Sequence, residues 1–433
     1  MPKKSGGHLT ENRRRRRHIR KRRVTIVITS FLVIILAITG FGVFKVYENA
    51  KEKPFITQLS KHLNSLYVNH VFPSQLATKA GIAKFSSELT NEKSKISSSS
   101  FEAFKKKIAV LDLKIDKQNA INALFASPVF SGEKVSASTV KDTTYQKNID
   151  EVSLNKLPDD RFLTQAKKEL DNAQTQVKKR DQAQVSFQKL VDVVAQNPSN
   201  SHLLDAQNVL DKLPEAAKAK ETQALVNAVQ KFYAGKKLIA LTFDDGPDAT
   251  TTPTLLNSLE KDNVNVTFFE IGSSIAGNEA ILKRETADGD QICSHTWTHP
   301  QLTSLSSAAA NLEITRAANL ITQVTGQDWP FYRPPYEAVN QTVLNSVNMS
   351  AVNYDVDTED WKDSTSAPVY AAAMAGAHDG AIVLMHDIHP WSVAAAPQVI
   401  DSLKAQGYTF VTVSQLIYAR SGAIQIHHDY FGW

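Results

Sequence analysis

The chain has 433 residues, enough for two or three domains, and its 42% hydrophobic and 21% charged residues exclude a wholly disordered protein. The net charge of +5 is unevenly distributed, because residues 1–23 carry +10 and the other 410 residues carry −5. The single cysteine, Cys293, excludes an intrachain disulfide and is expected to be a small buried filler.

The amino-terminal segment combines a basic arm, residues 1–23, with a long apolar stretch. Val24–Phe44 contains 21 residues without a charge or a proline. As a helix this stretch spans roughly 30 Å, the thickness of a hydrocarbon core, whereas a cleavable signal has an apolar region of about 7–15 residues. We therefore expect a single transmembrane anchor over 24–44 rather than a cleaved signal, with the basic arm in the cytoplasm and the catalytic part outside the plasma membrane. On the same rule the arginines set the topology, and nucleic acid is not an expected partner.

Residues 46–230 are expected to be mainly helical. Apolar residues at helical spacing lie in three stretches, which begin at Ile56, Leu163 and Leu225. Another helix is expected to start at an N-cap Ser99, with Glu102 three residues later completing a capping box. Residues 126–158 lose the periodicity and resemble a connector or a small extended patch. We interpret 46–230 as a helical stalk whose stripes pack on each other; a region that guides substrate is the alternative.

From Lys236 onward, short apolar runs alternate with helical stretches. Strands are expected at Lys237–Phe243, Val264–Phe269, Gln291–Ser294, Ala351–Tyr354, Ala381–Met385 and Thr409–Val413. Helices are expected at Ser307–Val324 and Pro397–Gln406. This alternation predicts an α/β domain with a parallel sheet or barrel over 236–420, followed by a tail over 421–433. In such folds the chemistry gathers at the carboxyl ends of the strands.

Two motifs at predicted strand ends point to a metal. They are Thr242-Phe243-Asp244-Asp245-Gly246-Pro247 and Ser294-His295-Thr296-Trp297-Thr298-His299-Pro300. A carboxylate with two imidazoles is a common ligand set for a hydrolytic metal and leaves a coordination position free for water. The other carboxylate of the aspartate pair would supply a base beside the ligand. Taken singly the motifs are weak, since Asp-Asp-Gly-Pro is often a turn and paired histidines are often surface residues.

Five blocks in one order strengthen the interpretation. They are Thr242-Phe243-Asp244-Asp245-Gly246, His295-Thr296-Trp297-Thr298-His299, Arg333-Pro334-Pro335-Tyr336, Asp357-Thr358-Glu359-Asp360-Trp361 and Leu384-Met385-His386. With these blocks the chain resembles the polysaccharide deacetylase family, carbohydrate esterase family 4, over about residues 236–418. The resemblance implies a distorted (β/α) barrel that acts as a metal-dependent hydrolase, here of the membrane-anchored peptidoglycan deacetylase type.

The resemblance assigns the first two blocks to a metal and a base. Asp245, His295 and His299 would hold a divalent metal, usually zinc. Asp244 would be the general base that takes a proton from the metal-bound water. Arg333, from the third block, would pair with Asp244 and keep it ionised, because an adjacent cation lowers the pKa of a carboxylic acid.

The remaining blocks would serve the reacting carbonyl and the leaving group. The resemblance implies that Tyr336 offers its backbone N–H to the tetrahedral oxyanion. His386 would be the general acid for the departing amine, oriented by Asp360. Trp361 and Leu384 would form walls of the acetyl pocket. Together the five blocks supply an activated water, a stabilised oxyanion and a proton for a poor leaving group, which amide hydrolysis requires.

One position departs from the family pattern, and three aromatic neighbours stay open. Glu337 follows the Arg-Pro-Pro-Tyr block where family members commonly have glycine, which bears on the shape of the oxyanion loop and on substrate preference. Trp297 and Trp391 could stack on sugar rings or only pack. His389 could touch sugar hydroxyls, although a histidine in a surface turn is the simpler interpretation.

The leading hypothesis is a deacetylase that releases acetate from an extracytoplasmic N-acetylated glycan, with peptidoglycan N-acetylglucosamine as the favoured substrate. Its expected partners are this wall glycan and the membrane, and its expected cofactor is a divalent metal, in the first place Zn²⁺. One alternative is a deacetylase or O-acetyl esterase for another surface polysaccharide. The other is a non-catalytic wall-binding protein, which would be expected to have lost the base or a metal ligand.

Overall fold

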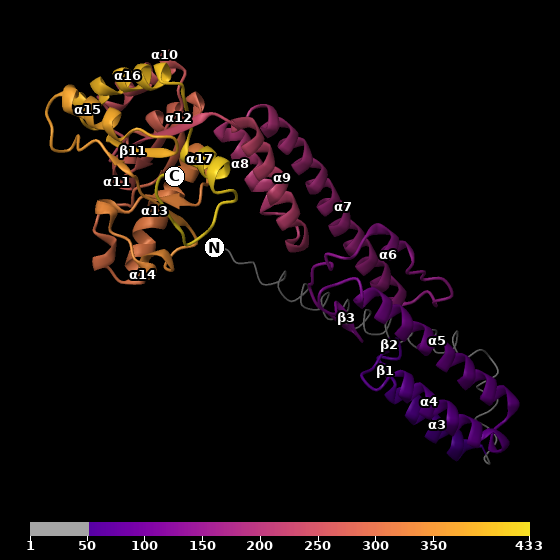
Figure 1. Ribbon diagram of the computed structural model, residues 1–433. Coiled ribbons are helices and arrows are strands. Elements are labelled where there is room, and N and C mark those ends of the chain that lie inside the picture. Colours follow the sequence, from indigo (N-terminus) through magenta and orange to yellow (C-terminus); the bar gives the residue numbers. More distant parts are fainter. Residues whose placement is uncertain (1–51) are drawn as a thin grey trace, which may run out of the picture. The chain divides into compact units, whose positions relative to one another are not determined.

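The computed structural model describes residues 52–433 (Figure 1). The chain forms two compact units, the first ending at Lys179 and the second running from Arg180 to Trp433. Among the described residues, no helix has both the length and the apolar character needed to cross a bilayer. The predicted basic arm, residues 1–23, and the predicted anchor, residues 24–44, lie outside the described residues.

The first unit is built from helices joined by two short antiparallel hairpins. Its helices are α3 (Lys53–Ser65), α4 (Lys79–Asn91), α5 (Ser98–Asn122), α6 (Gln146–Asp150) and the start of α7 (Arg161–Gln196). Its strands are β1 (Tyr67–Val68), β2 (Phe72–Pro73), β3 (Phe130–Ser131) and β4 (Lys134–Val135). The helix α5 begins two residues before the predicted start, because the Ser97 hydroxyl, not that of Ser99, accepts the capping hydrogen bond from the Ser100 N–H.

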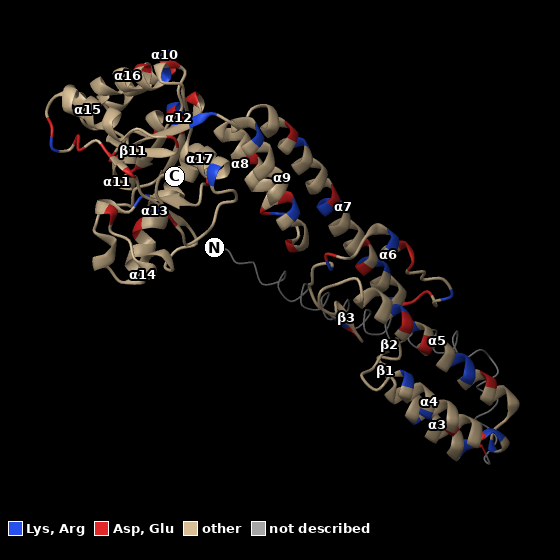
Figure 2. Ribbon diagram, viewed as in Figure 1, with Lys and Arg blue, Asp and Glu red and all other residues tan. Residues whose placement is uncertain are grey.

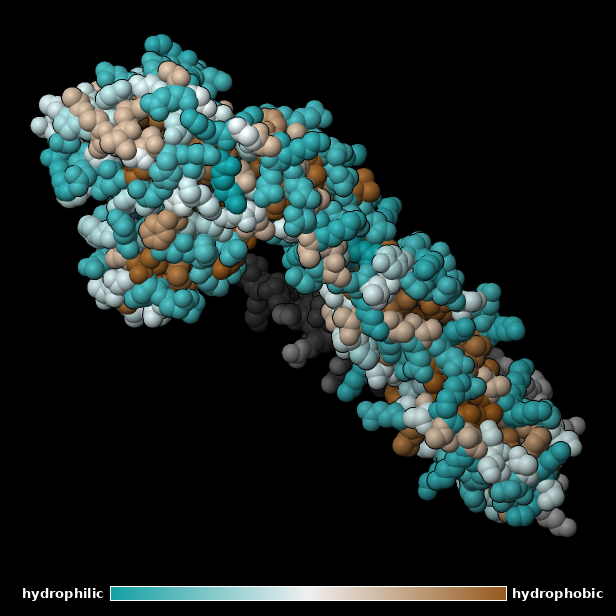
Figure 3. Space-filling model, viewed as in Figure 1, coloured by the Kyte–Doolittle hydropathy of each residue, from teal (hydrophilic) through white to brown (hydrophobic). Residues whose placement is uncertain are grey.

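Apolar packing stabilises this first unit. Ile56, Leu59 and Leu63 of α3 pack with residues of α4 and α5 in one core. A second core includes Phe130 and Phe162, whose ring centroids lie 5.0 Å apart. Both signs of charge occur along α4 and α5 (Figure 2), and the visible surface is mainly hydrophilic with scattered hydrophobic residues (Figure 3). The stripe that begins at Ile56 packs on other helices of this unit, whereas Leu225 and Val229 of the last predicted stripe pack with strand residues of the second unit.

The second unit contains a nine-stranded sheet and the helices that cover it. Its strands are β5 (Lys237–Asp244), β6 (Thr267–Glu270), β7 (Gln291–Ser294), β8 (Phe331–Tyr332), β9 (Ser350–Val352), β10 (Val356–Asp357), β11 (Ala381–His386), β12 (Tyr408–Phe410) and β13 (Asp429–Tyr430). Its helices are the end of α7, then α8 (Asn200–Leu210), α9 (Glu215–Tyr233), α10 (Thr252–Asp262), α11 (Gly272–Ile275), α12 (Glu279–Asp288), α13 (Ser307–Thr325), α14 (Gln341–Leu344), α15 (Ser366–Gly376), α16 (Pro390–Ala405) and α17 (Val413–Arg420).

All strand pairs of this sheet are parallel. The order is β10-β11-β5-β6-β7-β8-β9-β13, and β12 pairs with the start of β5. The sheet curls into a partial barrel, which confirms the predicted parallel α/β architecture. The tail over 421–433 contributes β13, which pairs with β9, and the Trp433 N–H donates to the Gly380 carbonyl just before β11 (3.1 Å).

Alternation along β5 shows how the barrel is filled. Ile239, Leu241 and Phe243 pack in the core that the sheet shares with α10, α15 and α16. Leu238 and Ala240 point to the other face, where α9 and α17 close the core. On that face the next two residues of β5, Thr242 and Asp244, are polar, so the apolar core ends where the candidate site begins.

Most predicted elements exist, with shifted boundaries. The helix predicted over Pro397–Gln406 begins earlier, at Pro390, and Pro397 lies inside it. The strand predicted over Thr409–Val413 ends at Phe410, because Thr412 caps α17 and Val413 is its first residue. The prediction omitted β8, β10 and β13, each of two residues, which are too short for a periodic pattern.

Candidate active site

The five blocks meet at the carboxyl ends of the strands. Asp244 is the last residue of β5 and lies opposite His386, the last residue of β11, in the parallel register. His295 follows β7 directly, and Arg333 follows β8. The sheet therefore brings together side chains that are up to 142 positions apart in the sequence, as expected for this class of fold.

Arg333 and Asp244 form a buried ion pair at the base of the site. An Arg333 Nη1 atom donates to Asp244 Oδ1 at 2.8 Å and to the Thr242 hydroxyl at 2.7 Å, and the Arg333 side chain is 1% exposed. Its other nitrogens donate to the backbone carbonyls of Val352 and Asn353. Burial raises the pKa of Asp244 above its ordinary value, and the Arg333 charge opposes this shift without cancelling it. The expected ion pair is present, but burial has the larger effect on the pKa.

Asp245, His295 and His299 converge on one point. Their candidate ligand atoms all lie within 4.8 Å of one another. Both imidazole Nε2 atoms are 3.4 Å from Asp245 Oδ1, a buried oxygen without a hydrogen-bond partner in the described part of the chain. A buried carboxylate oxygen that faces two ring nitrogens requires a cation or protons between them. This donor set fits a divalent metal ion.

The protonation state of His295 suits a residue that coordinates a metal. Its Nδ1 lies 2.8 Å from the Arg333 carbonyl oxygen, which can only accept, so Nδ1 carries the proton and Nε2 presents a lone pair to Asp245. Burial lowers the pKa of His295 to about 3, which keeps the ring neutral.

The segment after β7 that carries His295 and His299, the ligand loop, is not helical, so helical spacing does not explain why both rings face Asp245. Thr296 (φ 70°) and His299 (φ 59°) have left-handed backbone conformations, as does Asp245 (φ 75°). Glu313 on α13 holds the loop, accepting hydrogen bonds from the N–H groups of Trp297 (3.1 Å) and Thr298 (2.8 Å). Strained residues persist where neighbouring contacts fix them, and they cluster at functional sites.

His386 and Asp360 form a second acid–base pair. His386 Nδ1 donates to Asp360 Oδ1 at 2.7 Å, and the His386 backbone N–H donates to Asp360 Oδ2 at 2.7 Å. Burial disfavours the imidazolium, but the hydrogen bond and the charge of Asp360 outweigh burial and raise the pKa of His386 to about 9. His386 Nε2 lies 3.9 Å from Asp245 Oδ2, so the ring faces the ligand group. His386 is therefore protonated at neutral pH and could donate a proton.

Three further predicted residues surround these groups. Tyr336 is 70% exposed, and its ring centroid lies 4.8 Å from that of His299. Its backbone N–H takes part in no backbone hydrogen bond within residues 52–433 and is available to a ligand. Trp361, 53% exposed, lies beside Asp360, whereas Leu384 is buried on β11.

Comparison with known proteins places this geometry in a family. The profile of the family described as polysaccharide deacetylase matches residues 232–354. The chitooligosaccharide deacetylase of a Bradyrhizobium strain is 31% identical over 210 residues, which are 44% of this chain and 96% of that protein. The chain belongs to the polysaccharide deacetylase family. Members of this family are metal-dependent hydrolases, in agreement with the Asp245, His295 and His299 group.

Two proteins similar to this chain carry names that specify peptidoglycan. The peptidoglycan-N-acetylglucosamine deacetylase PgdA of Listeria monocytogenes is 41% identical over 220 residues, 51% of this chain and 44% of that protein. The peptidoglycan-N-acetylmuramic acid deacetylase PdaC of Bacillus subtilis is 40% identical over 181 residues, 42% of this chain and 39% of that protein. This chain therefore covers less than half the length of either protein.

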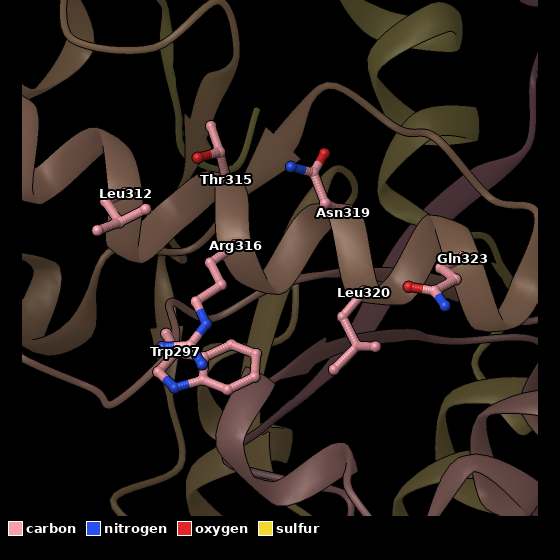
Figure 4. Close-up of a pocket in the computed structure, with 7 residues that line it drawn as sticks. All are labelled: Trp297, Leu312, Thr315, Arg316, Asn319, Leu320 and Gln323. Carbon is pink, nitrogen blue, oxygen red and sulfur yellow. The ribbon is translucent and has the colours of Figure 1, made fainter.

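The deacetylase domain also has a pocket of about 350 Å³ behind the ligand loop (Figure 4). Its lining residues are Trp297, Leu312, Thr315, Arg316, Asn319, Leu320 and Gln323. The Arg316 guanidinium lies 3.6 Å from the centroid of the Trp297 ring, and a Cβ on Gly272 would meet the same ring at 2.5 Å. Trp297 is thus packed between α11 and α13, and the predicted metal ligands, base and general acid do not line this pocket.

Sequence reasoning missed residues that support the site. Glu313 carries no signal, because it lies 14 residues beyond His299 in an ordinary helical pattern. The Trp391 indole N–H donates to the Asp360 carbonyl at 2.7 Å, while its ring stacks on His389 with centroids 4.8 Å apart. Trp391 therefore supports the pair of His386 and Asp360, in addition to any contact with a ligand.

Proposed function

We propose that this protein hydrolyses N-acetyl groups of an extracytoplasmic glycan and releases acetate, with peptidoglycan N-acetylglucosamine as the substrate. The observation that carries the proposal is the convergence of one ligand group, one buried carboxylate base and one protonated imidazole at the same strand ends. The names of two similar proteins, PgdA and PdaC, support peptidoglycan as the glycan.

We propose Zn²⁺ as the metal, held by Asp245, His295 and His299, since one carboxylate oxygen and two imidazole nitrogens suit zinc. When bound, the ion would polarise the acetyl carbonyl and increase the acidity of water at the site. Asp244 accepts the proton of the attacking water, and Arg333 keeps the Asp244 carboxylate in place.

The other groups act on the oxyanion, the leaving group and the acetyl methyl group. The Tyr336 backbone N–H donates to the oxyanion as negative charge develops on the acetyl oxygen. His386 donates a proton to the departing amine nitrogen, because an amide anion would be a poor leaving group. Asp360 fixes the ring orientation and stabilises the imidazolium. Leu384 and Trp361 are proposed to contact the acetyl methyl group.

The cellular location is part of the proposal and rests on the sequence of residues 1–44. A cytoplasmic basic arm and an anchor over 24–44 would leave residues 46–433 on the outer side of the plasma membrane, where wall glycan is found. Residues 46–230 would then serve as a stalk.

Acetate release tests this function. The full chain, purified in detergent with one equivalent of zinc, is incubated with peptidoglycan, chitin oligomers and acetylated xylan, and both acetate and new amines are measured. We expect acetate and amines in equal amounts from peptidoglycan, and none from the Asp244→Asn variant. Acetate without amines would indicate an O-acetyl esterase, amines from N-acetylmuramic acid would change the sugar, and no acetate from any glycan would indicate a non-catalytic wall-binding protein.

A further inference from the structure

The segment that carries the proposed oxyanion donor has an unfavourable backbone conformation. We call Pro334–Ala338 the Tyr336 loop. Within it Tyr336 has φ 60° and ψ 24°, and Glu337 has φ 56°. Residues with a Cβ rarely adopt this left-handed backbone region, and the free-energy costs of two such residues add up. The loop therefore needs contacts from outside itself to keep this shape.

Few contacts within the loop can stabilise this backbone conformation. The Glu337 N–H donates to the Pro334 carbonyl at 3.2 Å and the Ala338 N–H donates to the Pro335 carbonyl at 3.1 Å, both at the long end of the normal range. The side chains of Tyr336 and Glu337 are exposed. Burial thus contributes little to fixing these two residues.

Two side chains from outside the loop reach it. One is His299, whose ring lies against that of Tyr336, and the other is Tyr354. Tyr354 follows β9, is half-buried, and donates a hydrogen bond from its hydroxyl to Glu337 Oε1. Burial, together with this acceptor, holds the pKa of Tyr354 above its ordinary value, so that the hydroxyl keeps its proton at neutral pH.

Tyr354 is itself anchored to the catalytic ion pair. The Arg333 guanidinium lies 5.6 Å from the centroid of the Tyr354 ring. Arg333 also donates to the carbonyl of Asn353, the residue before Tyr354, at 3.2 Å. The group that pairs with the base therefore also fixes the residue that reaches the loop.

We propose that the hydrogen bond from Tyr354 to Glu337, which we call the loop clamp, positions the Tyr336 backbone N–H for the oxyanion. Glu337 is on this account a positioning residue, which stabilises a left-handed backbone that glycine would adopt without help. The inference rests on the proposed function, because the loop matters only if an oxyanion forms there. Loss of the clamp should lower kcat with little change in KM, since the N–H acts on charge that develops in the transition state.

The test removes the clamp in two backbone backgrounds. Tyr354→Phe keeps the ring but removes the donor, and we expect kcat to fall about three- to tenfold. Glu337→Ala should cause a similar fall, and the double variant no further one, because both changes remove the same contact. Glu337→Gln should retain kcat, because its amide oxygen still accepts. In a Glu337→Gly background, Tyr354→Phe should change nothing, because glycine needs no clamp.

Two controls separate the clamp from general damage. Tyr370→Phe removes another tyrosine hydroxyl, which lies 3.0 Å from Ser402 Oγ between α15 and α16, and should leave kcat unchanged. Hydrogen exchange of the Glu337 and Ala338 amides, which requires no substrate, should become faster in Tyr354→Phe. The proposal is overturned if Tyr354→Phe lowers kcat equally in the glycine background, or if it leaves the hydrogen exchange of these amides unchanged. If the parent protein releases no acetate, the proposed function fails, whereas unchanged exchange would refute the clamp alone.

Discussion

The two units treat buried polar groups in different ways. In the first unit the buried Lys114, 2% exposed, is fully partnered, since it donates to Asp160 and to the Val71 carbonyl, each at 2.6 Å. In the second unit several buried carboxylate oxygens lack a hydrogen-bond partner among the described residues. They belong to Asp245, Glu270, Glu285, Asp288, Asp290 and Asp387. In the described part of the chain, the first unit has two such oxygens, of Glu52 and Glu92, whereas the second has eight. Buried polar atoms without partners cost stability, so most of this cost falls on the unit that contains the candidate site.

Backbone strain follows the same division. Of the eleven non-glycine residues with positive φ in the described chain, six lie in the five motif blocks or directly after one: Asp245, Thr296, His299, Tyr336, Glu337 and Glu359. The first unit has three, all in connections between elements: Asn69, His70 and Lys156. The helical unit is thus built for packing, whereas most strained residues of the barrel lie at the end that carries the candidate site.

The largest expected effect is on the proton donor. His386→Ala should lower kcat about 10²- to 10⁴-fold, because the departing amine then lacks a general acid. The matched control is His389→Ala, three residues later, which should have a small effect since His389 stacks on Trp391 and makes no hydrogen bond with Asp360 among the described residues. Acetate release by both variants decides the point. Equal losses would show that the two histidines are not functionally distinct.

The next effect is on stability of the barrel. Arg333→Met should lower the free energy of unfolding by roughly 3–5 kcal/mol, because it leaves the buried Asp244 carboxylate unpaired. Urea unfolding followed by tryptophan fluorescence measures this selectively, since all five tryptophans lie in the second unit. Arg316→Met, which removes a cation from the Trp297 ring, is the control and should cost about 1 kcal/mol or less. Similar losses for both variants would contradict the special role of the Arg333 pair.

A substitution in the helical unit should lower stability without lowering activity. Lys114→Met should lower the stability of the first unit by roughly 2–3 kcal/mol, because Asp160 and the Val71 carbonyl lose their partner. Hydrogen exchange in α5 should therefore become faster, while acetate release from a soluble chitin oligomer stays the same. A matched loss of activity would mean that the first unit contributes to catalysis.

The smallest expected effect concerns pH. Burial raises the pKa of Asp290 to about 7, against about 3.9 for an unfolded aspartate. The folded state therefore binds more protons than the unfolded state between these values, and stability falls as pH rises from about 4 to about 7. Asp290→Asn removes this contribution, so between pH 6 and pH 8 the free energy of unfolding of the variant should fall by roughly 1–2 kcal/mol less than that of the parent. Fluorescence-monitored unfolding at both pH values, with the exposed Asp401→Asn as control, tests it; an identical slope in parent and variant would contradict the assignment.

The sequence predicts the barrel better than its details. Long buried runs such as Lys237–Phe243 and Ala381–Met385 predict strands that the structure confirms, because apolar runs of this length are buried in parallel sheets. The two-residue strands β8, β10 and β13 depend on neighbouring strands for their hydrogen bonds and carry no local pattern. The stalk predicted over 46–230 and the catalytic domain predicted over 236–420 stay predictions; the compact units divide at residues 179 and 180, within α7.

The site could be predicted as a set of residues but not as a geometry. The blocks identified the convergent groups, since strand ends bring them together. Three features have no signal in a single sequence: the left-handed turns that aim Asp245 and His299 at one point, the support of the ligand loop by Glu313, and the contact between Tyr354 and Glu337. Each depends on contacts between segments far apart along the chain.

Zinc content tests the central claim most directly. The full chain is stripped with chelator, titrated with zinc and compared with Asp245→Ala, His295→Ala and Asp244→Asn. We predict one tightly bound ion per chain in the parent and in Asp244→Asn, which keeps the ligands but removes the base, and loss of tight binding in the other two variants. Unchanged zinc affinity in Asp245→Ala and His295→Ala would contradict the claim that these side chains form the metal site.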